Sequence, residues 1–354
     1  MRVAIIGLPQ SGKSTIFAAV TGIHSEPGAA REPRHAVVRV PDPRLAYLTD
    51  LYQPKKVTEA TIEFIDVPGC ALDEAKGQEE WRRLLPVVRQ AELLAVVVRD
   101  FSNAAVPAYR NRVDAKADFA AVWDELIFAD LDAVTTRVDR LEKALKKPSK
   151  THEAEKRELA LLLRCREALE AGSPLSTVLS TDEERRLLSS FAFLTERPLL
   201  CIRNVSDDAS SMTEGLDVDH VAESLALSAA VEAEIAMLDP ADRPAFLADL
   251  GFAESARDRS IRTCYRACGL ISFLTMGADE VRAWTIPLGA TAVEAAGKIH
   301  TDLARGFIRA ETVSYDDLVA LKDLKGARAG GKVRKEGKAY VVSDGDILNI
   351  LSSA

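Results

Sequence analysis

The sequence lacks long apolar segments, has few cysteines and carries no excess of positive charge. No stretch approaches the roughly 18 uncharged apolar residues of a membrane-spanning helix, so no membrane partner is expected. The formal net charge of −8 disfavours general DNA binding through bulk charge. Five cysteines, an odd number, lie scattered without paired spacing, which is typical of reduced thiols in a cytosol. Because the start of the chain also has no signal-peptide layout, a cytoplasmic location is predicted.

Apolar residues make up 47% of the 354 residues, enough for sizeable cores in two or three domains. In the first part of the chain, short apolar runs typical of buried strands alternate with helical segments. This alternation predicts a mostly parallel α/β sheet. The predicted strands are Arg2–Ile6, Thr61–Asp66, Leu93–Val98, Leu199–Arg203 and Ser224–Leu227, with a helix at Ile16–Val20 after the first.

A helical insertion interrupts this α/β segment from about Phe119. Apolar residues recur there at alternating spacings of four and three, the seam of a heptad pattern: Ile127, Leu131, Val134, Val138, Leu141 and Leu145. After a break near Pro148, a second charged helix is predicted from His152 to Glu170. Two interpretations remain open, an antiparallel coiled-coil hairpin and two ordinary bundle helices. Thr181 with Glu184 forms a capping box for a further helix.

The pattern of predicted strands and helices changes from about Leu270 onward. Short strand-like runs alternate with two short helices, which predicts a small α+β domain. The predicted strands are Leu270–Thr275, Val281–Thr285, Ile308–Ser314 and Ala339–Val342, and Gly326–Gly331 is predicted to be a flexible turn. Basic residues in this part are more readily interpreted as a solvated charged face than as a contact surface: Arg305, Arg309, Lys332, Arg334 and Lys335.

Residues 7 to 14 read G-L-P-Q-S-G-K-S and match the G-x-x-x-x-G-K-[ST] phosphate-binding loop. The match lies between a predicted strand and a predicted helix, which is the context that this motif requires. Gly7 and Gly12 allow the backbone to curl, so that its N–H groups, including those of Gln10 and Ser11, cradle phosphate oxygens. The positive end of the following helix adds to the attraction. We therefore predict a nucleoside triphosphate site here.

Three side chains of this loop and helix are expected to act on the triphosphate. Lys13 would reach the β- and γ-phosphates, the Ser14 hydroxyl would bind Mg²⁺, and Thr15 would donate to the α-phosphate. A second motif, D-x-x-G, ends the strand Thr61–Ile65: Asp66 would hold Mg²⁺ through water, and Gly69 would offer its N–H to the γ-phosphate. Lys13, Asp66 and Gly69 are the predicted catalytic residues, and Ser14 and Asp66 the predicted metal ligands.

Recognition of the base is expected where the later strands end. The first candidate segment reads Asn204-Val205-Ser206-Asp207, and the second includes Ser228 and Ala229. GTP-binding proteins use N-K-x-D, in which the Asp accepts hydrogen bonds from guanine and the Lys stem packs on the base. Here Val205 replaces the Lys while Asp207 remains, so guanine is not excluded. The alternative interpretation is that both segments are ordinary turns at the ends of strands.

Beyond these motifs, longer strings resemble the Obg-like ATPase family, also called YchF. The strings include V-P-D-P-R-L at 40–45, A-T-I-E-F-I-D at 60–66, V-R-A-W-T-I at 281–286 and A-A-G-K-I-H-T-D-L-A-R-G-F-I-R-A-E at 295–311. The resemblance implies a GTPase-type P-loop domain, a coiled-coil insertion and a C-terminal TGS domain with a β-grasp fold. We place the P-loop domain at 1–118 and 196–265, the insertion at 119–195 and the TGS-like domain at 268–354.

The resemblance further implies slow hydrolysis of ATP to ADP and phosphate, with Mg²⁺, in a regulatory switch that contacts the ribosome or translation factors through the coiled coil and the TGS domain. Preference for ATP over GTP is linked in the family to N-x-x-E, whereas this chain has Asp207 at the Glu position. Two alternatives stay open: a GTPase of the translation-factor class, and a nucleotide-binding scaffold with little hydrolysis.

Two segments, switch I and switch II, depart from the family pattern, and Cys70 departs from GTPases although the family likewise has an apolar residue there. Alignment on the 40–45 string places Ala30 at the Thr of the family's switch I and Arg34 at its final Asn. Cys70 follows D-x-x-G, where many GTPases have a Gln that orients water. The Gly-rich switch II of the family is largely replaced by C-A-L-D-E-A-K-G-Q at 70–78, in which Asp73 and Gln78 are nearby polar residues without an assigned role. The chain therefore looks like a divergent paralogue.

Overall fold

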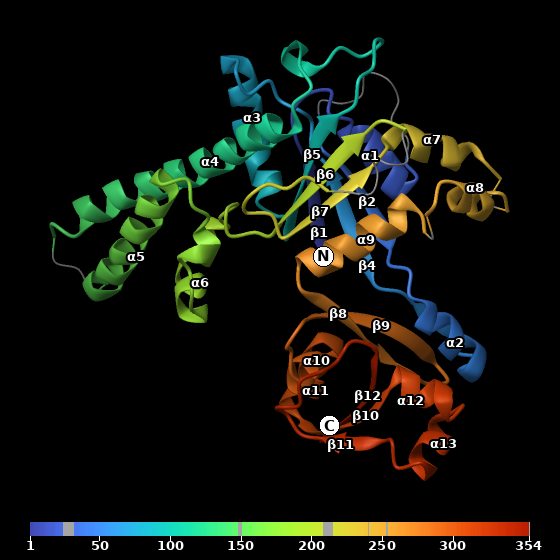
Figure 1. Ribbon diagram of the computed structural model, residues 1–354. Helices are drawn as coiled ribbons and strands as arrows, with labels where there is room; N and C mark the ends of the chain where they lie inside the picture. The colour runs from blue at the N-terminus through green and yellow to red at the C-terminus, as the bar shows by residue number, and fades with distance from the viewer. Residues whose placement is uncertain (24–31, 148–150, 208–214, 240, 253, 354) are drawn as a thin grey trace. The chain divides into compact units, whose positions relative to one another are not determined.

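The computed structural model describes residues 1–23, 32–147, 151–207, 215–239, 241–252 and 254–353 (Figure 1). Contacts between residues divide the chain into two compact units. The first contains Met1–Val37 and Glu63–Ala267, and the second contains Val38–Ile62 and Cys268–Ala354. The segment 38–62, which the sequence assigns to the P-loop domain, is thus grouped with the C-terminal part. The three-domain division itself stays a prediction.

The first unit is built on a six-stranded sheet in the order β2-β4-β1-β5-β6-β7. β1 runs parallel to β4 and β5, and β6 runs parallel to β5 and β7. The strands are β1 (Arg2–Ile6), β2 (Arg34–Arg39), β4 (Thr61–Asp66), β5 (Leu93–Asp100), β6 (Leu199–Val205) and β7 (Glu223–Leu227). All five strands predicted for this part are confirmed, as is the mixed α/β class.

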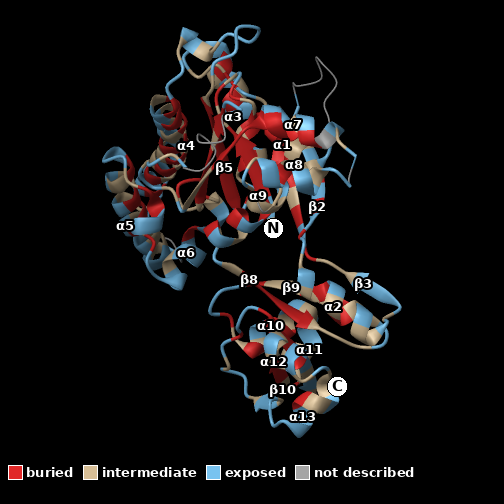
Figure 2. Cartoon of the chain, turned by 45° about the vertical axis from the view of Figure 1, so that its right-hand side comes forward, coloured by how far each residue is buried: buried red, intermediate tan, exposed pale blue. Residues whose placement is uncertain are grey.

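Helices cover both faces of this sheet, which buries its strands (Figure 2). One face packs against α3 (Ala75–Val88) and the first half of α4 (Ala115–Ala144), with Trp81 and Phe119 in that core. On the other face lie α1 (Lys13–Thr21), α7 (Ala229–Met237) and α9 (Ala256–Ala267), with α8 (Arg243–Asp249) between the last two in sequence. Burial on both faces explains why β5 reads as an unbroken apolar run with alternation absent.

The second half of α4 packs with α5 (His152–Glu170) around a separate core. Of the six seam positions, four are buried in this core: Ile127, Val134, Val138 and Leu141. The core also contains residues outside the two helices, Leu175, Leu179 and Phe193, so a third layer of chain closes it. α6 (Asp182–Leu188) begins at the predicted capping box of Thr181 and Glu184. The choice between coiled coil and bundle stays a prediction.

The second unit contains a mixed sheet in the order β11-β10-β12-β8-β9-β3. Its strands are β3 (Lys56–Thr58), β8 (Leu270–Thr275), β9 (Glu280–Pro287), β10 (Phe307–Ser314), β11 (Arg334–Glu336) and β12 (Asp346–Ser352). Its helices are α2 (Pro43–Tyr52), α10 (Ala292–Ile299), α11 (Thr301–Arg305), α12 (Tyr315–Ala320) and α13 (Leu324–Ala329). β3, from the 38–62 segment, adds an edge strand parallel to β9.

Three sequence predictions for this unit are wrong. Four short helices, α10 to α13, lie among its C-terminal strands, where the sequence predicts two. The run Ala339–Val342 is not a strand, because only Val341 makes an isolated bridge, with Thr291, and the last strand lies further on at β12. The predicted flexible turn at Gly326–Gly331 is largely the helix α13. Asp323 caps this helix by accepting a hydrogen bond of 2.6 Å from the Gly326 amide, which offsets the low helix propensity of glycine.

Among the residues that the structure describes, no helix combines the length and apolar character needed to cross a bilayer. Within the first unit, the parallel strands bring their carboxyl ends to one edge of the sheet, where α/β proteins bind their ligands. The loops that follow β1, β4, β5, β6 and β7 therefore meet at this edge.

Candidate nucleotide-binding site

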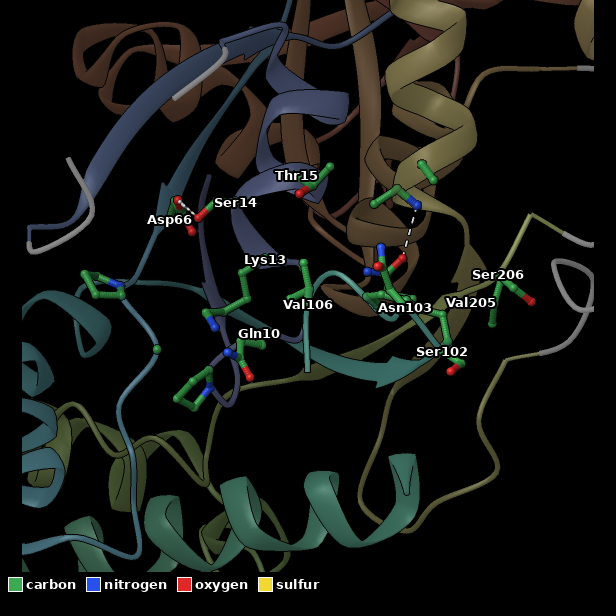
Figure 3. Close-up of a pocket in the computed structure, with 18 of the residues that line it drawn as sticks. Gln10, Lys13, Ser14, Thr15, Asp66, Ser102, Asn103, Val106, Val205 and Ser206 are labelled. Atoms are coloured by element: carbon green, nitrogen blue, oxygen red, sulfur yellow. Dashed lines mark hydrogen bonds between the residues drawn. The ribbon is translucent and has the colours of Figure 1, made fainter. Parts of the chain in front are cut away.

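A cavity of about 730 Å³ lies at this edge of the sheet, entirely within the first unit (Figure 3). Most of its lining comes from the loops that end the parallel strands and from the start of α1. The lining residues are Pro9, Gln10, Gly12, Lys13, Ser14, Thr15, Glu32, Arg34, Asp66, Pro68, Gly69, Phe101, Ser102, Asn103, Val106, Asn204, Val205, Ser206, Asp207, Ala229 and Ala230.

The curl of the phosphate loop depends on glycine at two positions. Gly7 has φ of 148°, and a Cβ there would lie 2.3 Å from the Val97 carbonyl oxygen of β5. Gly12 has φ of 91°, and its Cβ would lie 2.1 Å from Nδ2 of Asn204. Gly12 is also the N-cap of α1, and no side chain of the described residues caps the start of that helix. The loop therefore ends at helix donors that are open to an anion.

Lys13 is nearly buried, with 6% of its surface exposed, and its Nζ donates a hydrogen bond of 2.7 Å to the Leu8 carbonyl oxygen. Burial lowers the pKa of Lys13 to about 8, although the nearby Asp66 and Cys70 act in the opposite direction. Gly69 lies directly against this ammonium group, since a Cβ on Gly69 would be 2.6 Å from Nζ. The ammonium group and the D-x-x-G loop are thus brought together as the motifs predict.

Asp66 ends β4 beside the first turn of α1. Its Oδ2 accepts a hydrogen bond of 3.0 Å from the Ser14 hydroxyl and forms an ion pair with Arg34 (Figure 3 shows the Ser14 contact). Its Oδ1 is buried and has no hydrogen-bond partner among the described residues. A carboxylate with an unpaired buried oxygen, next to a hydroxyl, is the oxygen donor set that Mg²⁺ uses in nucleotide sites. Ser14 and Asp66 therefore fit the ion that the sequence predicts.

The other end of the cavity is held together by Asn204. Its Nδ2 donates to the Ser11 carbonyl oxygen at 3.0 Å, and its Oδ1 accepts from the Ala229 amide at 3.1 Å. The side chain is 2% exposed. Asn204 thus joins the phosphate loop to the loop that follows β7. The base end of the cavity, where the sequence predicts recognition of the base, is the part lined by Asn204, Val205, Ser206, Asp207 and Ala229.

Eleven of the predicted site residues line the cavity: Gln10, Gly12, Lys13, Ser14, Thr15, Asp66, Gly69, Asn204, Val205, Asp207 and Ala229. Two other predicted site residues, Ser11 and Ser228, are outside the lining and stabilise the segments that form it. Ser11 contributes the carbonyl oxygen that Asn204 binds. Ser228 caps α7 by accepting a hydrogen bond of 3.4 Å from the Val231 amide. Their roles toward a nucleotide remain predictions.

The loop that follows β5 is a part of the site that sequence reasoning missed. Phe101, Ser102, Asn103 and Val106 line the cavity. The buried guanidinium of Arg99 holds this loop by donating to the carbonyl oxygens of Phe101, Val106 and Pro107 and to that of Gln10 in the phosphate loop. The one available signal was a buried-type apolar run, 93–98, that continues directly into the charged pair Arg99 and Asp100.

The residues considered for orienting water lie outside the lining of the cavity. Cys70 packs in the apolar core with Leu72 and Trp81, and burial raises the pKa of its thiol to about 11. Asp73 pairs with Arg110 at 3.1 Å, and the Gln78 amide donates to the Leu72 carbonyl oxygen at 3.1 Å. Ala30, the residue at the switch I Thr position, lies outside the described residues.

A phosphate loop between β1 and α1, with a Ser–Asp pair beside it on a parallel sheet, defines a P-loop nucleoside triphosphate-binding protein of the GTPase type. In agreement, a family model described as "50S ribosome-binding GTPase" matches residues 2–126. A second model, YchF-GTPase_C, described as "Protein of unknown function (DUF933)", matches residues 270–352.

The chain belongs to the YchF family, which confirms the resemblance seen in the sequence. It is 39% identical to the ribosome-binding ATPase YchF of Escherichia coli O157:H7 over 98% of both chains. It is 38% identical to the protein of the same name from Bacillus subtilis, over 98% of this chain and 97% of that one. The solved structure of the Schizosaccharomyces pombe YchF GTPase matches 99% of this chain and 97% of its own, with a TM-score of 0.80 and 27% identity.

Proposed function

We propose that this protein is a nucleotide-driven switch that hydrolyses ATP slowly to ADP and phosphate and acts on the ribosome. The observation that carries the proposal is the phosphate end of the cavity, where a curled loop, the Lys13 ammonium and the Ser14–Asp66 pair converge. The names of relatives at 38–39% identity support ATP and the ribosome as its partners. A ribosomal role would place the protein in the cytoplasm.

In this proposal the phosphate loop and Lys13 bind the triphosphate tail. The Lys13 ammonium would exchange the Leu8 carbonyl oxygen, 2.7 Å away, for phosphate oxygens that carry full charge, a stronger charge-assisted contact. Ser14 and Asp66 would hold Mg²⁺, which neutralises charge on the phosphates when it is bound. The backbone of Gly69, packed against Lys13, would then meet the terminal phosphate and couple the loop after β4 to its presence.

Slow hydrolysis follows from the position of Cys70. In many GTPases the residue after D-x-x-G is a Gln that orients the attacking water. In this chain that residue is Cys70, which is 4% exposed and packs in the apolar core. A Cys70→Gln variant is therefore expected to gain no activity, because its side chain would enter the apolar core, and to lose about 2 kcal/mol of stability. Single-turnover phosphate release and chemical denaturation measure both effects, with Cys70→Leu as the apolar control. A large rate increase in the Gln variant alone would contradict this placement.

Preference for ATP is the finer part of the proposal. Val205, Ser206 and Asp207 line the base end, and Asp207 stands where the family has Glu. Displacement of a fluorescent ATP analogue by unlabelled ATP and GTP measures the preference directly. We expect ATP to compete better, and Asp207→Glu to widen the difference, while Asp182→Glu on the distant helix α6 leaves it unchanged. Stronger competition by GTP in the wild type would favour the GTPase alternative.

Hydrolysis itself is tested by release of phosphate in the presence and absence of ribosomes. We expect slow release by the protein alone, faster release with ribosomes, and none above background for Lys13→Ala. Equal background-level rates for both proteins, with nucleotide still bound by the wild type, would favour a scaffold without hydrolysis. The scaffold without hydrolysis is the one alternative function that the position of Cys70 supports.

The residues that contact the ribosome or a translation factor are not assigned by this proposal. The basic residues of the second unit are partly neutralised within it. Lys332 pairs with Asp317 at 3.0 Å, and Arg334 lies 3.7 Å from Glu336. These contacts support the reading of a solvated charged face rather than a dedicated anion surface.

A further inference from the structure

The cation nearest to Asp66 comes from the chain itself. Arg34, the first residue of β2, forms an ion pair with Oδ2 of Asp66, the same oxygen that accepts the Ser14 hydrogen bond. Both residues line the cavity that also contains Lys13. The Asp66 side chain is 5% exposed and that of Arg34 is 22% exposed. A guanidinium group thus covers the carboxylate that was predicted to serve Mg²⁺.

Two contacts fix the position of the Arg34 side chain. Its guanidinium carbon lies 5.0 Å from the centre of the Phe17 ring, close enough for a cation–π interaction with the core of α1. Phe17 is fully buried. The arginine is therefore held between an aromatic ring and a carboxylate at the wall of the cavity. By the alignment on the 40–45 string, Arg34 falls at the position of the neutral Asn that ends the switch I motif of the family.

Charge balance explains what the arginine does there. An ionised carboxylate that is almost fully buried needs a cation or several donors nearby. Ser14 supplies one hydrogen bond, and the unpaired Oδ1 shows that the described residues supply no donor on that side. Arg34 provides a direct ion pair to Oδ2, in addition to the charge of the nearby Lys13 ammonium group. A magnesium ion bound between Ser14 and Asp66 would also neutralise this carboxylate, and the magnesium ion and the guanidinium group repel each other at this range.

We propose that Arg34 is an internal competitor of Mg²⁺ for Asp66, so that Mg²⁺ bound with the nucleotide must displace the guanidinium group. This inference rests on the proposed nucleotide site and concerns its regulation. Arg34 keeps Asp66 neutralised before the nucleotide arrives, and it weakens the coupling between Mg²⁺ and nucleotide.

The test compares the affinity for a fluorescent, non-hydrolysable ATP analogue in excess Mg²⁺ with the affinity in EDTA. The ratio of the two dissociation constants measures the coupling between metal and nucleotide. In Arg34→Asn, which restores the family residue, we expect this ratio to be about tenfold larger than in the wild type, the order set by loss of one charge-assisted contact. Arg34→Lys keeps the charge and should stay near the wild-type ratio.

The matched control is Arg39→Asn, which removes an arginine from the same strand and from an exposed ion pair with Glu59. Its ratio should equal that of the wild type. If Arg34→Asn and the wild type bind the analogue with the same ratio, the competition does not exist and the inference is wrong. If the wild type binds no analogue in either condition, the proposed nucleotide site fails instead. The two failures are therefore distinguishable.

Discussion

The phosphate end of the cavity is formed mainly by one short stretch of chain, whereas the base end is assembled from three separate loops. At the phosphate end, Lys13 and Ser14 are fixed by the loop and helix to which they belong. At the base end, Asn204 must join segments 193 and 25 residues away, at Ser11 and Ala229. The phosphate end therefore depends on the backbone conformation of one stretch of chain, whereas the base end depends on a few long-range hydrogen bonds. The two ends should therefore respond differently to mutation.

Lys13→Ala is expected to have the largest effect, because it removes the only lysine among the cavity's described lining residues. Loss of a charged contact to the triphosphate should weaken binding of an ATP analogue by about 100-fold. Calorimetric titration measures the change. Lys116→Ala, at an exposed position of α4, is the control and should bind as the wild type does. Binding within a few-fold of the wild type for Lys13→Ala would remove Lys13 from the site.

Gly12→Ala tests the backbone of the phosphate end. The added Cβ would meet Asn204 at 2.1 Å in a left-handed conformation, so both ends of the cavity should be disturbed. We expect a loss of about 2 kcal/mol of stability and a loss of nucleotide affinity. Gly22→Ala has a similar positive φ of 76° but open space around the Cβ. It should cost about 1 kcal/mol, measured by thermal unfolding, and leave affinity unchanged. Equal effects of the two changes would argue against the close approach of Asn204.

Asn204→Ala removes the joint between the base end and the phosphate loop. It leaves the Ser11 carbonyl oxygen and the Ala229 amide without their partner, so about 2 kcal/mol of stability should be lost. Affinity for nucleotide should fall by about tenfold, because the loops of the base end are no longer joined while the residues of the phosphate loop are unchanged. Asn349→Ala removes an exposed amide that contacts Glu311 at 3.3 Å and serves as the control. Unchanged denaturation and binding in Asn204→Ala would show that this joint is not needed.

The smallest effect is a dependence on pH that belongs to the phosphate end. Burial lowers the pKa of Lys13 from 10.5 to about 8 in the folded chain. Between these values the unfolded state binds more protons, so the folded state gains stability as the pH rises, and below about pH 8 the cost of burial is fully present. Lys13→Met removes this cost. Its stability advantage over the wild type should shrink by about 1 kcal/mol between about pH 8 and pH 9, as measured by urea unfolding. A constant difference would contradict the shifted pKa.

The same contrast explains what the sequence could predict. Five of the six strands of the first sheet, the capping box at Thr181 and the phosphate loop are encoded locally, by apolar runs or short motifs, and the structure has them. The edge strand β2, in which buried and exposed residues alternate, was not predicted. Val341 has strand-like neighbours but makes a single bridge. Whether an apolar run becomes a strand depends on the strands with which it can pair. Those strands are remote in sequence, so the local pattern does not determine the outcome.

At the site, the unpredicted features are those that depend on distant partners. The side chain of Arg34 reaches Asp66, and Arg99 donates to carbonyl oxygens of two loops. No spacing rule places either guanidinium group, since each contact depends on strand order within the sheet. Cys70 could be recognised as a departure from GTPases, but only the packing of Trp81 and Leu72 shows that its side chain lies in the core.

Calorimetric titration of the purified protein with ATP in the presence of Mg²⁺ decides whether the phosphate loop is a working site. We expect saturable binding of one nucleotide per chain, an affinity about 100-fold lower in Lys13→Ala, and an affinity that falls when Mg²⁺ is removed. A folded wild-type protein that takes up neither ATP nor GTP under these conditions would contradict the assignment of this cavity to a nucleoside triphosphate.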